Sequence, residues 1–526
     1  MVFNIKVGFF ATIFFFLVSS GTAVSQSYDV IIRNGRIVDG TGNPWFKGDI
    51  GISGDKIAYL GDLGDASGKR ELDATGLYVT PGFIDTHSHS GPGLSSQSLS
   101  AGRPLLSQGI TTVFINPDGG GAVDLKSQKE QLMEHGIGVN VIQLVPHGSI
   151  RRLVMGTENR GPTRPEMSEM LDLVERGMKE GAFGLSTGTF YVPGSYSEAP
   201  EIVEVAKVVA KYNGMYASHI RDESNYTVGL ISAVEEVIDV ARKADLPSIV
   251  THVKALGPPV WGYSTAIVRK IEAAREEGLE IYADQYPYLG SSTGLSAALL
   301  PRWAQSGGAD SLLNRLDRPG VREDIRAAMS DNLVRRGGAD RIQFRRVAFD
   351  ESIEGKLLSD VAEERDESAL EVALDVIRKG GASIISFNMF RDDLETLMIQ
   401  PWTMTSSDGG LVPWMEGVPH PRSYGAFPRK IRKYVLDEQL MSLGQAVKSM
   451  TGLPAQVFRI EDRGLLRVGS YADILVFDLP RINDPATFTN PHQLAEGMVE
   501  VFVGGEAAVS DGQFTGVMAG KIITRN

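Results

Sequence analysis

The sequence contains no cysteine among its 526 residues and only eight histidines. The absence of cysteine excludes disulfide bonds, thiolate zinc sites, iron–sulfur clusters, a cysteine nucleophile and lipid attachment to an N-terminal cysteine. Basic side chains are also few, with 52 against 65 acidic ones, so the formal net charge is −13. This balance argues against a general nucleic-acid binder, because phosphate binding requires a basic face.

Long hydrophobic runs are absent except at the N-terminus. Lys6 precedes an almost wholly apolar run at 7–18, and Ala23-Val24-Ser25 offers the small residues of a cleavage site. This order is typical of a signal peptide, which we assign to residues 1–25. The alternative is an uncleaved anchor, but the run is shorter than the roughly 20 residues that span a bilayer. We therefore expect a periplasmic or secreted protein with no stable membrane anchor after cleavage.

Short β-prone runs occur near both ends of the chain. In residues 26–80, the run at 28–32 is followed by an Asn34-Gly35 turn and further strand-like runs, which is typical of hairpins. Within residues 436–526, the runs at 472–478 and 499–503 have the same character. We expect the two ends to pair into one small β domain, with residues 436–526 also completing the central domain.

Between these ends, in residues 81–435, short apolar runs alternate with helical patterns. The eight runs are 82–85, 111–116, 139–145, 182–186, 214–218, 248–251, 280–284 and 402–406. Eight such units predict an α/β fold of the (β/α)₈ TIM-like barrel class. The long interval before the eighth run is interpreted as an insertion at about 295–395, a helical lid, although residues 383–387 are also compatible with a strand.

The candidate metal ligands follow these runs. His87 and His89 come directly after the first run, His219 and His252 end the fifth and sixth, and Asp408 ends the eighth. In a parallel barrel the carboxyl ends of all strands open onto one face, which holds the active site. Imidazole and carboxylate ligands suit Zn²⁺, with one or two ions expected and another divalent metal as the alternative.

The other histidines carry less information. His135 and His492 are interpreted as surface or packing residues. His147 ends the third run, where it is a candidate for contact with the substrate or for support of the metal ligands. A lone histidine at one strand end is weak evidence, whereas the joint pattern of the five candidate ligands predicts metal binding.

Seven blocks of this sequence carry a further signal. They are Gly82-Phe83-Ile84-Asp85-Thr86-His87-Ser88-His89, Gly184-Leu185-Ser186-Thr187-Gly188, Ser218-His219-Ile220-Arg221-Asp222-Glu223, His252-Val253-Lys254, Asp284-Gln285-Tyr286-Pro287-Tyr288, Ser407-Asp408-Gly409 and His420-Pro421-Arg422-Ser423-Tyr424-Gly425. Together these blocks resemble the N-acyl-D-amino-acid deacylase (D-aminoacylase) family of the amidohydrolase superfamily. The resemblance extends from about residue 28 to the end, and part of the insertion lies outside it. It implies a metal-dependent barrel with a small β domain, acting on a small N-acylated amino acid or peptide-like substrate.

The resemblance also implies roles for the ligands. His219 and His252 hold the tighter metal, while His87, His89 and Asp408 surround the second position. Asp408 is the general base, taking a proton from the attacking water and returning one to the leaving amine. The implied reaction is hydrolysis of a linear amide C–N bond without a covalent enzyme intermediate.

One position departs from the family pattern. The family has a metal-binding cysteine after the second strand, and the alignment places Asp118 at or near it. Other amidohydrolases use a carboxylated lysine on the fourth strand, but residues 182–187 contain no lysine. We expect Asp118 to bind the metal in its place, because a carboxylate is anionic and able to bridge two cations. The alternative is that Asp118 only stabilises a glycine-rich turn.

The substrate is expected to carry a free α-carboxylate, which requires cations and phenols. Arg221 and Glu223, which closely follow His219, are interpreted as an ion pair behind the metal rather than as substrate contacts. The candidate substrate-binding residues are Lys254, Tyr191, Tyr288, Arg422 and His147, with Ser292 at the same mouth.

Other functions remain open at this point. The same scaffold serves a dipeptidase, a cyclic-amide hydrolase or an L-amino-acid acylase, because stereochemistry is not visible in sequence. An inactive binding barrel is a further alternative, although all five strand-end ligands and the base are present. The sequence does not define the acyl group, the metal count or the oligomeric state.

Overall fold

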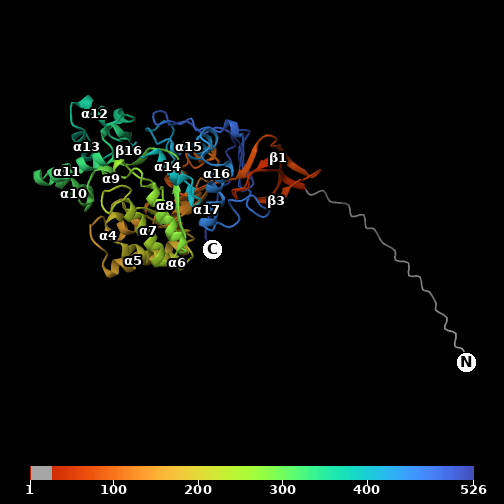
Figure 1. Ribbon diagram of the computed structural model, residues 1–526, viewed down its shortest axis with the longest axis horizontal. Helices are drawn as coiled ribbons and strands as arrows, with labels where there is room; N and C mark the ends of the chain where they lie inside the picture. The colour runs from red at the N-terminus through yellow and green to blue at the C-terminus, as the bar shows by residue number, and fades with distance from the viewer. Residues whose placement is uncertain (2–26, 526) are drawn as a thin grey trace.

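The computed structural model describes Met1 and residues 27–525. Residues 2–25 of the expected signal peptide lie outside the described residues, so that expectation stays a prediction. Among the described residues, no helix combines the length and apolar character needed to cross a membrane. Figure 1 shows the sheet containing β1 and β3 at one side of the molecule and helices α10–α13 at the other.

The central domain contains eight strand positions in the order of the sequence, all paired in parallel. One set of pairs joins β6, β7 and β8, and the other joins β9 to β10, β11, β12, β13 and β17 in that order. The Asp408 N–H donates to the carbonyl of His87 at 2.9 Å, which brings the end of β17 beside the end of β6. The strands are β6 (Phe83–Asp85), β7 (Ile110–Ile115), β8 (Asn140–Gln143) continued by β9 (Val145–Pro146), β10 (Gly184–Gly188), β11 (Met215–His219), β12 (Ser248–Val250), β13 (Ile281–Gln285) and β17 (Thr403–Thr405).

Helices cover the outside of these strands, each with one apolar face. In α7, Leu230, Val234 and Ile238 recur at helical spacing and are buried against the strands. Helix α5 begins with a capping box formed by Thr163 and Glu166. The main helices are α3 (Leu125–Met133), α4 (His147–Met155), α5 (Arg164–Lys179), α6 (Ala199–Ala210), α7 (Leu230–Ala244), α8 (Ser264–Glu276), α14 (Arg391–Met398), α15 (Arg422–Arg429), α16 (Leu443–Met450) and α17 (Gly452–Val457).

The two chain ends form one nine-stranded sheet. Strand β5 from the N-terminal segment pairs antiparallel with β18 from the C-terminal segment, placing Val79 opposite Val476. Both side chains are fully buried in the core of this small domain. The strands are β1 (Ser27–Ile37), β2 (Phe46–Ser53), β3 (Lys56–Gly61), β4 (Ser67–Asp73), β5 (Tyr78–Pro81), β18 (Ile474–Phe477), β19 (Met498–Val503), β20 (Glu506–Ser510) and β21 (Gln513–Phe514).

The last strand, β22 (Ile522–Ile523), returns to the central domain and pairs in parallel with β8. Sequence reasoning did not predict this contact, because a two-residue strand has no periodicity of its own. The chain therefore ends against the third strand of the barrel, beyond the small β domain.

The insertion contains a small sheet as well as helices. Strands β14 (Ser291–Gly294), β16 (Ser383–Ser386) and β15 (Ile342–Arg346) form an antiparallel sheet in that order. The 383–387 segment thus forms a strand, but it belongs to this sheet and not to the parallel one. The helices that pack on the sheet are α9 (Leu295–Leu299), α10 (Gly308–Leu316), α11 (Pro319–Arg335), α12 (Leu358–Arg365) and α13 (Ala369–Arg378).

Candidate metal centre

The carboxyl ends of the barrel strands bring six expected ligands together. They come from the ends of β6, β7, β11, β12 and β17, far apart in the sequence. Their ligand atoms form two groups that share one carboxylate, that of Asp118. The first group contains His87, His89, Asp118 and Asp408, and the second contains Asp118, His219 and His252.

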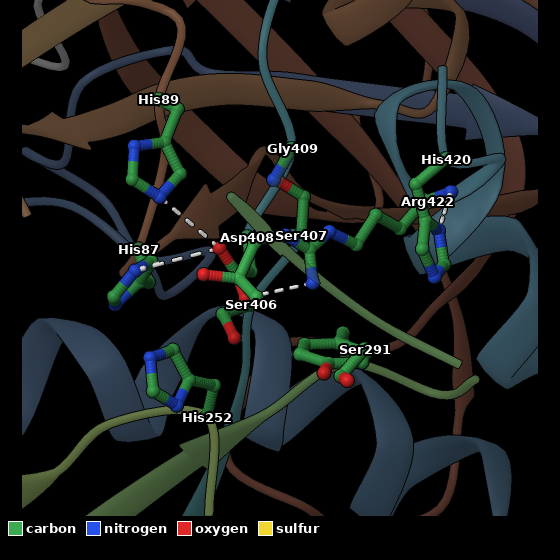
Figure 2. A network of polar contacts seen from close by, with 12 residues as sticks. His87, His89, His252, Ser291, Ser406, Ser407, Asp408, Gly409, His420 and Arg422 are labelled. Atoms are coloured by element: carbon green, nitrogen blue, oxygen red, sulfur yellow. Dashed lines mark hydrogen bonds and ion pairs between the residues drawn. The ribbon is translucent and has the colours of Figure 1, made fainter. Parts of the chain in front are cut away.

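In the first group, the imidazoles of β6 face two carboxylates. His89 Nε2 lies 3.2 Å from Asp408 Oδ1 and 3.4 Å from Asp118 Oδ2. His87 Nε2 lies 3.3 Å from Asp118 Oδ1 and 3.6 Å from Asp408 Oδ1. Figure 2 shows both rings turned towards Asp408, whose other oxygen contacts Arg422.

In the second group, two further imidazoles face the same Asp118 oxygen. His252 Nε2 lies 3.4 Å and His219 Nδ1 3.6 Å from Asp118 Oδ1. The Asp118 carboxylate therefore lies between the two groups, as a bridging ligand must.

The donor set fits a divalent metal. His87 Nε2, both ring nitrogens of His219 and Asp118 Oδ1 are buried and have no hydrogen-bond partner. Buried polar atoms left unpaired are costly, and here His87 Nε2, His219 Nδ1 and Asp118 Oδ1 face a common point, whereas His219 Nε2 faces Glu223. Imidazole nitrogens and carboxylate oxygens are ligands typical of zinc, with no thiolate to restrict the choice.

Neighbouring cationic side chains favour the ionised forms of Asp118 and Asp408. Burial opposes ionisation of Asp118, but His87 and the other imidazoles outweigh it and hold its pKa well below the usual range. Burial likewise opposes ionisation of Asp408, but Arg422 and His89 hold its pKa well below the usual range. Both groups are therefore ionised at neutral pH, the state required of a metal ligand and of a general base.

Glycines and a serine fix the Asp118 loop. Asp118 has a left-handed backbone (φ 54°), unusual for a residue other than glycine. Ser186 of β10 accepts from the Gly119 N–H at 3.1 Å and donates to the carbonyl of Asn116. A Cβ at Gly188 would lie 2.2 Å from the Asp118 carbonyl, so only glycine fits there. Neighbouring strands thus hold the carboxylate in place.

Two buried aspartates connect the loops that carry the ligands. Asp284 accepts from the His252 N–H at 2.9 Å and from the Ser406 hydroxyl at 2.7 Å. Asp85 accepts from the Ser407 N–H at 2.8 Å and also from the Ser407 hydroxyl. His252 and Asp408 also have left-handed backbones, with φ of 36° and 49°, and these contacts hold them there.

Glu223 lies behind the second group. Its carboxylate forms an ion pair with Lys254 and lies 3.1 Å from His252 Nδ1 and 3.8 Å from His219 Nε2. The prediction that Arg221 and Glu223 form an ion pair is wrong. Arg221 pairs with Glu236 of α7 at 2.6 Å. Because Glu223 contacts the outer nitrogens of both histidines, it orients the rings towards the metal position.

A cavity of about 1020 Å³ opens onto the centre. Four of the expected substrate-binding residues line it, namely Lys254, Arg422, Tyr191 and Ser292. Arg422 Nη1 lies 2.8 Å from Asp408 Oδ2. His420 accepts from the Arg422 N–H through Nδ1 at 3.0 Å, which fixes the start of α15 at the cavity wall.

Two expected substrate contacts do not line the cavity. Tyr288 is buried behind it, against His420, and donates to the carbonyl of Pro421 at 3.4 Å. His147 is fully buried at the start of α4, with Nε2 2.9 Å from Glu201 Oε1. Tyr286, from the same block as Tyr288, lines the cavity in its place, with the Arg422 guanidinium 4.6 Å from its ring centre.

The remaining histidines lie outside the metal centre. His492 Nδ1 and Tyr424 Oη are hydrogen-bonded at 2.8 Å, and the His492 ring packs against Trp414. Sequence reasoning missed Tyr286, Arg336 and Arg345 at the cavity. Tyr286 stands in the same block as Tyr288, whereas the two arginines have no motif that marks them.

Comparison with known proteins agrees with this geometry. The model of the amidohydrolase family matches residues 70–509. A D-aminoacylase of Alcaligenes xylosoxydans xylosoxydans is 33% identical over 95% of this chain and 98% of its own length. An N-acyl-D-glutamate deacylase of the same organism is 32% identical over 92% and 94% of the two chains.

Solved structures give the same result. A D-aminoacylase described with a binuclear metal centre superposes with a TM-score of 0.81 at 30% identity, covering 95% of this chain and 100% of its own. An N-acyl-D-glutamate deacylase of Bordetella bronchiseptica, complexed with zinc and a phosphonate inhibitor, gives 0.80 at 31% identity with the same coverage. The chain belongs to the amidohydrolase family, and within that class to the group formed by the D-aminoacylases. The (β/α)₈ barrel with a small β domain is thereby confirmed.

Proposed function

We propose that this protein is a zinc-dependent hydrolase that deacylates N-acyl-D-amino acids. The observation that carries the proposal is the Asp118 carboxylate, shared by two groups of imidazoles beside Asp408. Relatives also support the proposal. A D-aminoacylase, an N-acyl-D-glutamate deacylase and an N-acyl-D-aspartate deacylase each align over nearly the whole chain.

In this function, His219, His252 and Asp118 hold one metal position, and His87, His89, Asp118 and Asp408 surround the second. Bound at these positions, a divalent ion would supply Lewis-acid chemistry, which would activate water for attack and polarise the amide carbonyl. Asp408 accepts the proton of the attacking water, and the same proton passes to the leaving nitrogen as the C–N bond breaks.

The substrate α-carboxylate is assigned to the cations of the cavity wall. Arg422 contacts Asp408 directly, so a carboxylate bound by Arg422 places the adjacent amide beside the base. Lys254, although paired with Glu223, also lines the cavity. Tyr191 covers His219, with ring centres 4.6 Å apart, and closes that side of the site.

We further propose that the mature enzyme acts in the periplasm or outside the cell. The support is the Lys6, apolar run and Ala23-Val24-Ser25 order of residues 1–25. N-terminal sequencing of the protein recovered from the periplasmic fraction tests it. A full-length N-terminus in the cytoplasmic fraction overturns it.

The activity test uses mature, zinc-loaded protein with matched N-acetyl-D- and N-acetyl-L-amino acids. Hydrolysis of the D series, lost on treatment with a chelator and restored by zinc, is the expected result. Hydrolysis of the L series alone, or of neither series with zinc bound, contradicts the proposed function.

A further inference from the structure

Strand β15 of the insertion carries a β-bulge at Arg345. Phe344 pairs with Ile384 and Arg346 with Ser383, so Arg345 is the extra residue between two ladder positions. A bulge redirects side chains and is common beside binding sites. Phe344 is buried in the core of the insertion, Arg345 lines the cavity of the metal centre, and Arg346 lines a separate surface pocket.

These two consecutive arginines have opposite electrostatic surroundings. Arg346 contacts three carboxylates, those of Glu351 at 3.5 Å, Glu354 at 3.5 Å and Glu416 at 2.9 Å. Within residues 27–525, Arg345 forms no ion pair, and its buried Nε has no hydrogen-bond partner. Arg345 is half-buried, with its Nε shielded from water, and such a cation without an anion is unfavourable, so its position calls for a partner from outside the chain.

Arg345 lies within electrostatic reach of the reacting groups. Burial and the charge of Arg422 lower the pKa of Arg345 to about 10, while Asp408 opposes that shift. The side chain is therefore cationic at neutral pH. Its backbone carbonyl accepts from the Val418 N–H at 2.9 Å, which ties β15 to the loop that follows Asp408.

The α-carboxylate of the substrate does not require Arg345. Lys254 and Arg422 already line the cavity, and Arg422 is the one beside the base. A substrate with a single carboxylate leaves Arg345 without an anion once water is excluded. A site that contains a charged group discriminates strongly against a ligand lacking the complementary group.

We propose that Arg345 binds a second anionic group of the substrate, so that the preferred substrates are N-acyl-D-amino acids with an acidic side chain. This inference rests on the proposed deacylase function and adds the substrate class. The recognising residue comes from the insertion and not from the barrel.

The test uses an isosteric pair, N-acetyl-D-glutamate and N-acetyl-D-glutamine, which differ in charge but hardly in shape. We expect the zinc-loaded wild type to favour the glutamate by about 10-fold or more in kcat/KM. Arg345→Gln should bring this ratio close to one, mainly through KM for the glutamate, and leave the glutamine substrate within about threefold. Arg346→Gln, the adjacent control, should keep the wild-type ratio.

The possible failures are distinguishable. Equal hydrolysis of both substrates by the wild type overturns the inference and leaves the deacylase function intact. Equal losses for both substrates in Arg345→Gln assign the residue to the shared α-carboxylate and also overturn it.

Hydrolysis of neither substrate, nor of other N-acetyl-D-amino acids, overturns the deacylase function itself. Calorimetry of the two compounds with the zinc-loaded protein then decides the role of Arg345. Tighter binding of N-acetyl-D-glutamate, lost in Arg345→Gln, supports recognition of the anion, and equal binding overturns it.

Discussion

The barrel contributes both acidic and basic side chains to the cavity, whereas the insertion contributes only basic ones. All the acidic side chains among the described residues that line it, those of Asp118, Glu223 and Asp408, come from loops at the strand ends of the barrel. The insertion contributes Arg336 and Arg345 and no acid. Arg336 donates to Tyr226 Oη at 2.7 Å and to Ser386 Oγ at 3.0 Å, both neutral groups.

This difference separates two tasks. In the proposed function, carboxylates at the barrel rim hold metal and move a proton, which every substrate needs in the same way. In the proposed recognition, Arg345 of the insertion selects the charge of the substrate side chain, which differs from one substrate to another. Substitutions at the rim should therefore lower turnover of all substrates, and substitutions on the insertion should change KM selectively.

The largest effect is expected from Asp408→Asn. The amide keeps the shape of the side chain but does not accept a proton, so kcat should fall by about 10²- to 10⁴-fold for acidic and neutral substrates alike. Steady-state kinetics with zinc content measured in parallel checks this. A loss confined to one substrate class would break the comparison, because Asp408 would then act in recognition.

Asp118→Asn tests the shared ligand. Because Asp118 faces both groups of imidazoles, we expect bound zinc to fall to one equivalent or less per chain, measured by metal analysis after dialysis. Asp124→Asn is the matched control, since the exposed Asp124 only caps α3 through the Ser127 N–H. Unchanged zinc content in Asp118→Asn would contradict metal binding by Asp118 and favour the alternative that it only stabilises the turn.

The grouping of five expected ligands was predictable because they follow strand ends, where a barrel fixes the direction of each residue, whereas Asp118 was predicted from its alignment with the family cysteine. The ion pair between Glu223 and Lys254 was not predicted, because these residues are 31 positions apart and meet only in the fold. Tyr288 was chosen over Tyr286 because sequence does not show which side of the Pro287 turn faces the cavity. Arg345 depends on a bulge in β15, and no local pattern predicts it.

Lys430 lies in a third region, outside the cavity, where a charged group is expected to affect stability and not catalysis. Lys430 is buried behind β17 and donates to Thr405 Oγ1 and Ser449 Oγ, both at 2.9 Å. Burial lowers its pKa to about 7. Between pH 7 and about 10 the unfolded chain binds the extra proton, so stability should rise with pH by up to about 1.4 kcal/mol per unit.

Lys430→Met should remove this dependence while leaving kcat/KM within about twofold, because the residue does not line the cavity. Unfolding measured at pH 6, 7.5 and 9 gives the slope by difference from wild type. Lys433→Met, a half-exposed position of the same helical segment, should retain the slope. An identical slope in wild type and Lys430→Met would contradict the assignment.

The smallest effect is expected at Tyr286, where the barrel itself supports recognition. The Arg422 guanidinium lies 4.6 Å and the Lys254 ammonium 5.7 Å from the Tyr286 ring centre, so the ring holds the cations assigned to the α-carboxylate. A cation–π contact of about 1 kcal/mol corresponds to a roughly fivefold rise in KM for Tyr286→Leu. Tyr286→Phe keeps the ring, so its KM should stay close to that of the wild type. Because every substrate has an α-carboxylate, the rise should be equal for N-acetyl-D-glutamate and N-acetyl-D-glutamine, unlike the selective loss expected at Arg345.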